Sequence, residues 1–123
     1  VLDSSALLCL LNGEPGAARV AQALPAVVVG AVNLAEVVTK LREKGLSAEE
    51  ADEALSGLQL NVRPLTAAQA TATGHLRPSA RALGLSLGDR ACLALAAELG
   101  AVALTADRDW TRADVGVRVE VLR

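Results

Sequence analysis

Hydrophobic residues follow two different spacings along the chain, and each change of spacing marks a new element. Short apolar runs predict buried strands at residues 1–3, 26–30, 61–65, 101–105 and 117–122. Between these runs, apolar residues recur at helical spacing, as at Leu34, Val37 and Leu41. Helices are therefore predicted at residues 4–14, 16–24, 31–45 and 48–59, from residue 67 towards residue 81, and within residues 84–100.

Polar residues at the predicted helix starts support these boundaries. Ser47 with Glu50 forms a capping-box pair that opens the helix at residue 48. Thr66 with Gln69 repeats the pair before the next helix, which a glycine and a proline are expected to interrupt. Each helix therefore has a start signal of its own.

Strands and helices alternate throughout the predicted order. This order is typical of an α/β sandwich with a mostly parallel sheet and right-handed crossovers. A chain of 123 residues is the size of one ordinary domain, so we expect residues 1–123 to form a single domain. The first strand is short, and the abrupt start leaves open that residues precede Val1.

Composition predicts a closely packed aliphatic core. Hydrophobic residues make up 52% of the chain, with no Phe, Tyr or Met and one Trp. Cys9 and Cys92 lie inside apolar stretches, where a buried thiol acts as a small hydrophobe, so a disulfide is not expected. No apolar stretch approaches the roughly 20 residues that cross a bilayer, and no signal-peptide pattern is present. We therefore expect a cytoplasmic protein that does not enter a membrane.

Four acids are predicted to meet at one edge of the sheet. Asp3 ends the first strand, Glu36 lies in the first turns of a helix after a strand, Asp89 opens the helix in SLGDRAC, and Asp107 follows the strand AVALT. In a parallel sheet, ligands bind beyond the carboxyl ends of the strands, where the following helices begin. The four carboxylates are thus directed towards a common site.

A divalent cation would offset the repulsion among these carboxylates. Without one, some of them would have to take up protons. Hard oxygen ligands without imidazole or thiolate suit Mg²⁺ or Mn²⁺, which accept phosphate oxygens and activate an attacking water. The net charge of −2 argues against non-specific nucleic-acid binding, so a polyanionic substrate would need such ions.

Helix capping is an alternative role for three of the acids. Glu36 with Asn33 and Asp89 with Ser86 both fit capping boxes, and Asp107 also fits a cap of the short helix predicted after it. Capping and metal binding do not exclude each other. Other chemistries lack the residues they need. His75 is the single histidine, which leaves almost no material for a His-based triad or a zinc site. No glycine-rich phosphate loop is present, which argues against nucleotide binding.

Four segments resemble the PIN-domain nucleases, in particular the VapC-type toxins of bacterial toxin–antitoxin pairs. They are VLDSSALLCLLNGEPG, VNLAEVVTKL, LSLGDRACLALAAELG and AVALTADRDW, in the family's order and over nearly the whole chain. No single segment is decisive, but LSLGD followed by TADRDW at this spacing is quite specific to the family.

The resemblance implies a three-layer PIN-like sandwich whose five-stranded, mostly parallel sheet is flanked by helices. It also implies a Mg²⁺- or Mn²⁺-dependent endoribonuclease, a homodimer, and inhibition by a small VapB-like antitoxin whose C-terminal segment lies near the active site. The family's acidic quartet falls on Asp3, Glu36, Asp89 and Asp107, which would bind metal and catalyse. Ser5 and Thr105 match hydroxyls that support the acids, and Asp109 is a further candidate acid.

Five basic residues are candidates for contacts with RNA phosphates: Lys40, Arg42, Arg81, Arg108 and Arg112. Each also fits an ordinary solvated charge. Arg90 follows the third acid, where many relatives carry a small residue, and we expect it to point to solvent rather than to a phosphate. Two other functions stay open: a catalytically silent docking module of the same fold, and a structure-specific nuclease acting on DNA.

Overall fold

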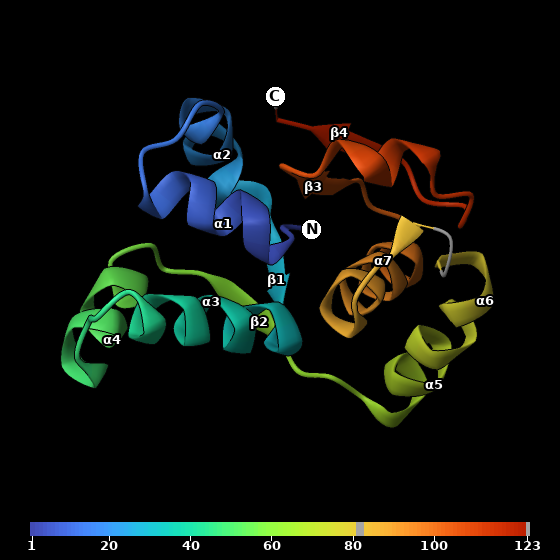
Figure 1. Cartoon of the computed structure of the whole chain (residues 1–123), viewed down its shortest axis with the longest axis horizontal. Coiled ribbons are helices and arrows are strands. Elements are labelled where there is room, and N and C mark those ends of the chain that lie inside the picture. Colours follow the sequence, from blue (N-terminus) through green and yellow to red (C-terminus); the bar gives the residue numbers. More distant parts are fainter. Residues whose placement is uncertain (81–82, 123) are drawn as a thin grey trace.

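A computed structural model describes residues 1–80 and 83–122 as helices alternating with short strands (Figure 1). The helices are α1 (Ser4–Leu11), α2 (Ala17–Ala23), α3 (Ala31–Glu43), α4 (Ala48–Ser56), α5 (Ala67–His75), α6 (Arg77–Ala80) and α7 (Leu87–Leu99). Two short 3-10 helices are η1 (Leu24–Ala26) and η3 (Arg108–Arg112). In Figure 1, α1 lies beside α2, α3 beside α4, and α5 beside α7, and these pairs are in contact. The predicted α/β class is therefore confirmed.

All strand pairs among the described residues are parallel. Strand β1 (Val28–Gly30) pairs with β2 (Asn61–Arg63), and β3 (Ala103–Thr105) pairs with β4 (Val119–Val121). Leu2 forms single parallel bridges to both β1 and β3, so it connects the two pairs.

The prediction of five strands is wrong in one respect. The described residues contain four named strands in two two-stranded sheets, and the first predicted strand is reduced to the bridge at Leu2. The reason is local, since the neighbouring Asp3 already caps helix α1 and its backbone carbonyl accepts the first bonds of that helix. Leu2 alone is left to pair on both sides.

Alternating strand residues point to opposite faces of the sheet and build two separate cores. Val1 and Ala103 belong to one hydrophobic cluster, which also contains much of α7 and Trp110. Leu2, Val29 and Leu104 belong to the other, which contains residues of α1, α3 and α4. A two-residue period puts neighbours on opposite faces, so helices cover both sides of the parallel strands.

The helix starts predicted from Ser47 and Thr66 agree with the structure except at one side chain, that of Gln69. Ser47 and Glu50 form a complete capping box at α4. Thr66 accepts a hydrogen bond from the backbone N–H of Gln69, as predicted. The side chain of Gln69, however, donates to Glu98 of α7 instead of returning to the cap, because packing of α5 on α7 brings that carboxylate within reach.

The aliphatic core is confirmed, and so is the expectation that its cysteines form no disulfide. Cys9 and Cys92 are both buried, and no disulfide joins them. Burial raises the pKa of the Cys92 thiol well above its ordinary value, and the negative charge of Asp3 adds to this effect. Both thiols therefore behave as small core residues.

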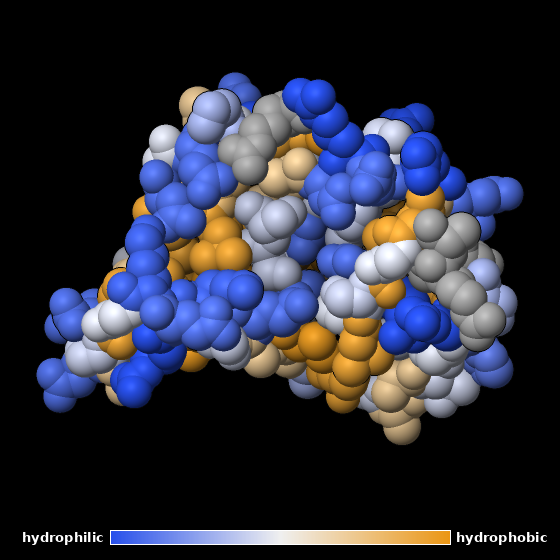
Figure 2. Space-filling view, in the orientation of Figure 1, coloured by the Kyte–Doolittle hydropathy of each residue, from blue (hydrophilic) through white to orange (hydrophobic). Residues whose placement is uncertain are grey.

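The surface is largely hydrophilic over α3 and α4, whereas hydrophobic residues gather between α3 and α5 (Figure 2). Four large hydrophobic side chains of the described chain are exposed, namely Val62, Leu65, Leu87 and Leu99. Within residues 1–80 and 83–122, the longest helices have 13 residues, and none is long and apolar enough to cross a membrane.

Candidate active site

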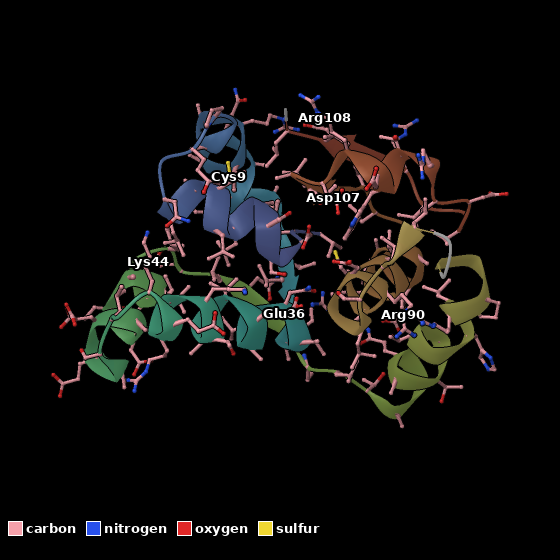
Figure 3. The ribbon with its side chains drawn as sticks, in the orientation of Figure 1. Cys9, Glu36, Lys44, Arg90, Asp107 and Arg108 are labelled. Atoms are coloured by element: carbon pink, nitrogen blue, oxygen red, sulfur yellow. The ribbon has the colours of Figure 1, made fainter. Side chains whose placement is uncertain are left out.

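The four predicted acids line one cavity. Its volume is about 220 Å³, and it lies where the carboxyl ends of the strand at Leu2, β1 and β3 meet the first turn of α7. Its lining residues are Asp3, Ser4, Ser5, Leu8, Glu36, Lys40, Asp89 and Asp107. Glu36 from α3 and Asp107 from the segment after β3 approach it from different sides (Figure 3). Folding thus brings together four carboxylates that are distant in sequence.

Asp3 is the most buried of the four acids. It is the N-cap of α1, and 2% of its surface is exposed. Its Oδ1 accepts from the backbone N–H of Ser5 at 3.1 Å, while Oδ2 accepts from the hydroxyls of Ser5 and Thr105, each at 2.5 Å. A buried carboxylate is costly unless donors surround it, and these three donors satisfy Asp3 and fix its direction.

The two hydroxyls also connect Asp3 to the segment that carries the fourth acid. Ser5 Oγ accepts from the backbone N–H of Ala106 at 3.0 Å, and Thr105 Oγ1 accepts from the N–H of Asp107 at 3.1 Å. Each hydroxyl therefore donates to Asp3 and accepts from the backbone after β3. The supporting role that the family resemblance implies for Ser5 and Thr105 has a direct geometric counterpart.

Glu36 is held by two neighbours on different helices. The Ser4 hydroxyl lies 2.6 Å from Glu36 Oε1 and 3.2 Å from Asp3 Oδ1, and its single proton favours the shorter bond. Asn33 Nδ2 donates to the same Glu36 oxygen at 3.0 Å. Ser4 thus connects the first two acids.

The predicted capping box at Asn33 and Glu36 is wrong. Helix α3 begins at Ala31 with Gly30 as its N-cap, so Asn33 already lies in the first turn and caps nothing. The apolar strand β1 runs into the helix without a polar cap, which moves the start three residues earlier than the pair suggests.

Asp89 combines a cap with a place in the cavity. It completes a capping box with Ser86 at the start of α7, as predicted. Burial raises the pKa of Asp89, hydrogen bonds from Ser86 lower it, and the negative charges of Asp3 and Glu36 raise it. The electrostatic coupling of Asp89 to the other acids reflects their proximity.

Asp107 is the most exposed of the four acids. It is the N-cap of η3, and its Oδ1 accepts from the backbone N–H of Asp109 at 2.9 Å. The carboxylate of Asp109 itself is exposed and is not among the residues that line the cavity. The structure therefore gives Asp109 a backbone role at this turn.

The donor set suits a hard divalent cation, although it does not form a ready-made cage. In the described part of the chain, no three His, Cys, Asp or Glu side chains are arranged closely enough to hold a metal by themselves. Mg²⁺ usually keeps several waters and is bound through one or two carboxylates. The cavity offers four carboxylates and, among its lining residues, the single cation Lys40. Its uncompensated negative charge and its oxygen donors fit such an ion.

Of the basic candidates that the structure describes, Lys40 alone is among the residues that line this cavity. Its Nζ lies 3.5 Å from Oε2 of Glu43, and both side chains are well exposed. Arg42 on α3 and Arg108 and Arg112 on η3 are also exposed. Arg81 lies outside the described residues.

Arg90 differs from the expectation of a solvated side chain. It is half-buried, and its Nη1 donates to the backbone carbonyl of Thr73 on α5 at 3.2 Å. Figure 3 shows it on the side of α7 that faces α5. The contact between α5 and α7 captures this arginine, so it neither points freely to solvent nor lines the acidic cavity.

Sequence reasoning missed two residues that shape the site, Ser4 and Gly88, and gave a third, Asn33, only a capping role. Ser4 follows the first acid directly, so a hydroxyl beside a strand-end carboxylate was the available signal. Gly88 precedes the third acid inside a helix, where glycine costs about 1 kcal/mol relative to alanine and calls for a packing reason.

Comparisons with known proteins agree with this fold. A family model described as PIN domain matches residues 1–116. A search of curated proteins finds no match.

Several crystal structures contain chains with a similar fold. A chain of VapBC2 from Rickettsia felis, bound to a DNA fragment from their promoter, has a TM-score of 0.76 and 17% identity, covering 98% of this chain and 96% of that one. A chain of DNA-bound VapBC from Salmonella typhimurium has a TM-score of 0.76 and 22% identity, covering 99% and 96%. A chain of VapBC-5 from Mycobacterium tuberculosis, a member of the VapBC family of toxin–antitoxin systems, has a TM-score of 0.54 and 22% identity, covering 79% and 81%.

Proposed function

Because the chain belongs to the PIN domain family, we propose that it is a divalent-metal-dependent endoribonuclease, the VapC-type toxin of a toxin–antitoxin pair. The observation that carries this proposal is the convergence of Asp3, Glu36, Asp89 and Asp107 on one cavity at the carboxyl ends of parallel strands. RNA is the proposed substrate, and the hydrolysed bond is a phosphodiester.

Mg²⁺ or Mn²⁺ would be held among the four carboxylates, directly or through bound waters, and when bound would supply positive charge and an activated water. The protein's own contribution is to hold these oxygens in place. Ser5 and Thr105 orient Asp3, and Ser4 and Asn33 orient Glu36. Such preorganisation matters because small displacements of reacting groups reduce the rate strongly.

Basic side chains near the cavity are proposed to position the RNA backbone. Lys40 lines the cavity and is the nearest candidate for a phosphate contact. Arg42, Arg108 and Arg112 are exposed and extend the set, and Arg81 remains a candidate from the sequence alone. Phosphate contacts position a strand without reading its sequence, so these residues are expected to contribute affinity rather than specificity.

The partner proposals follow from the structural neighbours. One neighbour, VapBC-5, is named as a member of the VapBC family of toxin–antitoxin systems, and two others carry the name VapBC, so we propose a VapB-like antitoxin for this chain. A homodimer, which the family resemblance implies, and a cytoplasmic place of action are further parts of the proposal. A small antitoxin-like reading frame beside the coding sequence, and growth arrest on expression without it, would support this assignment.

Digestion of matched nucleic acids tests the proposed activity. We expect the purified protein to cleave end-labelled single-stranded RNA in Mg²⁺ or Mn²⁺, to lose cleavage in EDTA, and to regain it with excess Mn²⁺. DNA of the same sequence and a structured DNA substrate are incubated in parallel and are expected to stay intact.

Each other outcome of the digestion contradicts a stated part of the proposal. Undiminished RNA cleavage in EDTA would rule out the metal-dependent mechanism. Preferential cleavage of structured DNA would replace the ribonuclease by a DNA nuclease. Absence of any cleavage, together with absence of Mn²⁺ binding, would identify a catalytically silent docking module.

A further inference from the structure

We propose that Asn33 is a positioning residue that holds the Glu36 carboxylate against the start of helix α7, and that Gly88 provides the space this arrangement needs. The inference rests on the proposed function, since it assigns how the metal-binding acids are placed. Neither residue lines the acidic cavity, so both act through Glu36.

The Asn33 amide connects the helices that carry the second and third acids. Its Nδ2 donates to Glu36 Oε1 at 3.0 Å and to the backbone carbonyl of Gly88 at 3.1 Å. Glu36 lies on α3, and Gly88 lies on α7 immediately before Asp89. One amide group therefore fixes Glu36 relative to Asp89.

The burial of Asn33 argues for more than a packing role. Its side chain is completely buried, and its Oδ1 has no hydrogen-bond partner in the described structure. An unsatisfied buried acceptor is destabilising, and an apolar residue of similar shape would avoid that cost. If Oδ1 and Nδ2 were exchanged, Oδ1 would face two acceptors, Glu36 Oε1 and the carbonyl of Gly88. The orientation found here is therefore the one in which Asn33 can donate to Glu36.

Gly88 lets the Glu36 carboxylate approach the backbone of α7. A Cβ added at Gly88 would overlap the carboxylate group of Glu36. Any larger residue would therefore displace Glu36 from the Asn33 and Ser4 donors. The close approach explains a glycine inside the first turn of a helix.

Together, these contacts connect the segments that carry the four acids. Thr105 connects Asp3 to the backbone of Asp107. Ser4, which directly follows Asp3, donates to Glu36. Asn33 connects Glu36 to the segment of Asp89. Removing the Asn33 amide breaks this connection between α3 and α7.

Calorimetric titration of the intact protein with Mn²⁺ tests the proposal. We expect Asn33→Leu and Gly88→Ala each to weaken Mn²⁺ binding by roughly ten- to hundred-fold, the usual effect of losing a group that orients a metal ligand. The rate of RNA cleavage is expected to fall together with the affinity for Mn²⁺. Urea unfolding of the metal-free variants checks that both variants fold. Tight Mn²⁺ binding by both folded variants would overturn the inference.

Gln69→Leu is the matched control. Gln69 is another nearly buried amide. Its side chain lies on α5 and donates to the Glu98 carboxylate on α7, and neither residue lines the acidic cavity. This variant is expected to lose stability without losing Mn²⁺ affinity. An equal loss of affinity in the control would show that general loosening of α7, and not the placement of Glu36, causes the effect.

A double-mutant comparison separates positioning from a structural role. In a Glu36→Ala background, neither Asn33→Leu nor Gly88→Ala should weaken Mn²⁺ binding further, because both act through the missing carboxylate. A further loss as large as in the wild-type background would contradict the proposal. A wild-type protein that binds Mn²⁺ but cleaves no RNA would refute the nuclease alone, whereas one that binds no Mn²⁺ would refute both ideas.

Discussion

Asp3→Asn is expected to abolish RNA cleavage while the protein keeps its fold. Asparagine is as good an N-cap as aspartate, so α1 should still start at Ser4. The variant removes the buried negative charge and places an amide where the Ser5 and Thr105 hydroxyls donate. We expect the rate to fall at least about a hundredfold, comparable with losing one preorganised electrostatic contact in an active site.

Initial rates on labelled RNA measure the loss of cleavage, and thermal unfolding of the same samples measures whether the fold is retained. Asp52→Asn is the control, because Asp52 is an exposed acid of α4 that does not line the cavity. It should retain the wild-type rate. Full activity of Asp3→Asn would remove Asp3 from the mechanism.

Trp110→Ala is expected to cause the largest loss of stability. Trp110 is completely buried in the cluster formed by Leu93, Leu95 and other residues of α7 together with the strands. It is the largest fully buried side chain of the described residues, so its truncation removes the most buried volume. Large-to-small changes at such aromatic positions cost about 3–5 kcal/mol of unfolding free energy.

Urea unfolding measures this loss, with two comparison variants. Leu87→Ala changes a leucine that is 61% exposed and should shift the unfolding free energy by about 0.5 kcal/mol or less. Trp110→Phe keeps a ring and removes an indole N–H that has no hydrogen-bond partner among the described residues, so it should cost less than Trp110→Ala. A cost for Trp110→Ala equal to that of Leu87→Ala would contradict the packing described for this core.

The four acids were accessible to sequence analysis because their positions follow from a general rule. Parallel strands place their carboxyl ends at one edge, and each acid follows a strand or begins a helix. Period-two alternation likewise predicts two faces, as the separation of Val1 from Leu2 into different cores illustrates. Local pattern was sufficient to bring the four acids to one cavity, but not to identify other lining residues such as Ser4.

The hydrogen bonds that orient the acids were not accessible, because they depend on tertiary packing. Asn33 and Glu36 have the spacing of a capping box, yet strand β1 leads directly into α3, and Asn33 instead turns to the backbone of Gly88. Arg90 was expected in solvent. Because α5 packs against α7, the guanidinium of Arg90 instead donates to the backbone carbonyl of Thr73 on α5. Contacts between elements decide such side-chain directions, and single-sequence spacing does not encode them.

Anomalous diffraction from a crystal soaked in Mn²⁺ tests the central claim most directly. The claim predicts a manganese peak inside the cavity, within coordinating distance of oxygens of Asp3 and at least one of Glu36, Asp89 and Asp107, either directly or through bound water. A fully soaked crystal with these carboxylates in place and no manganese between them would contradict it.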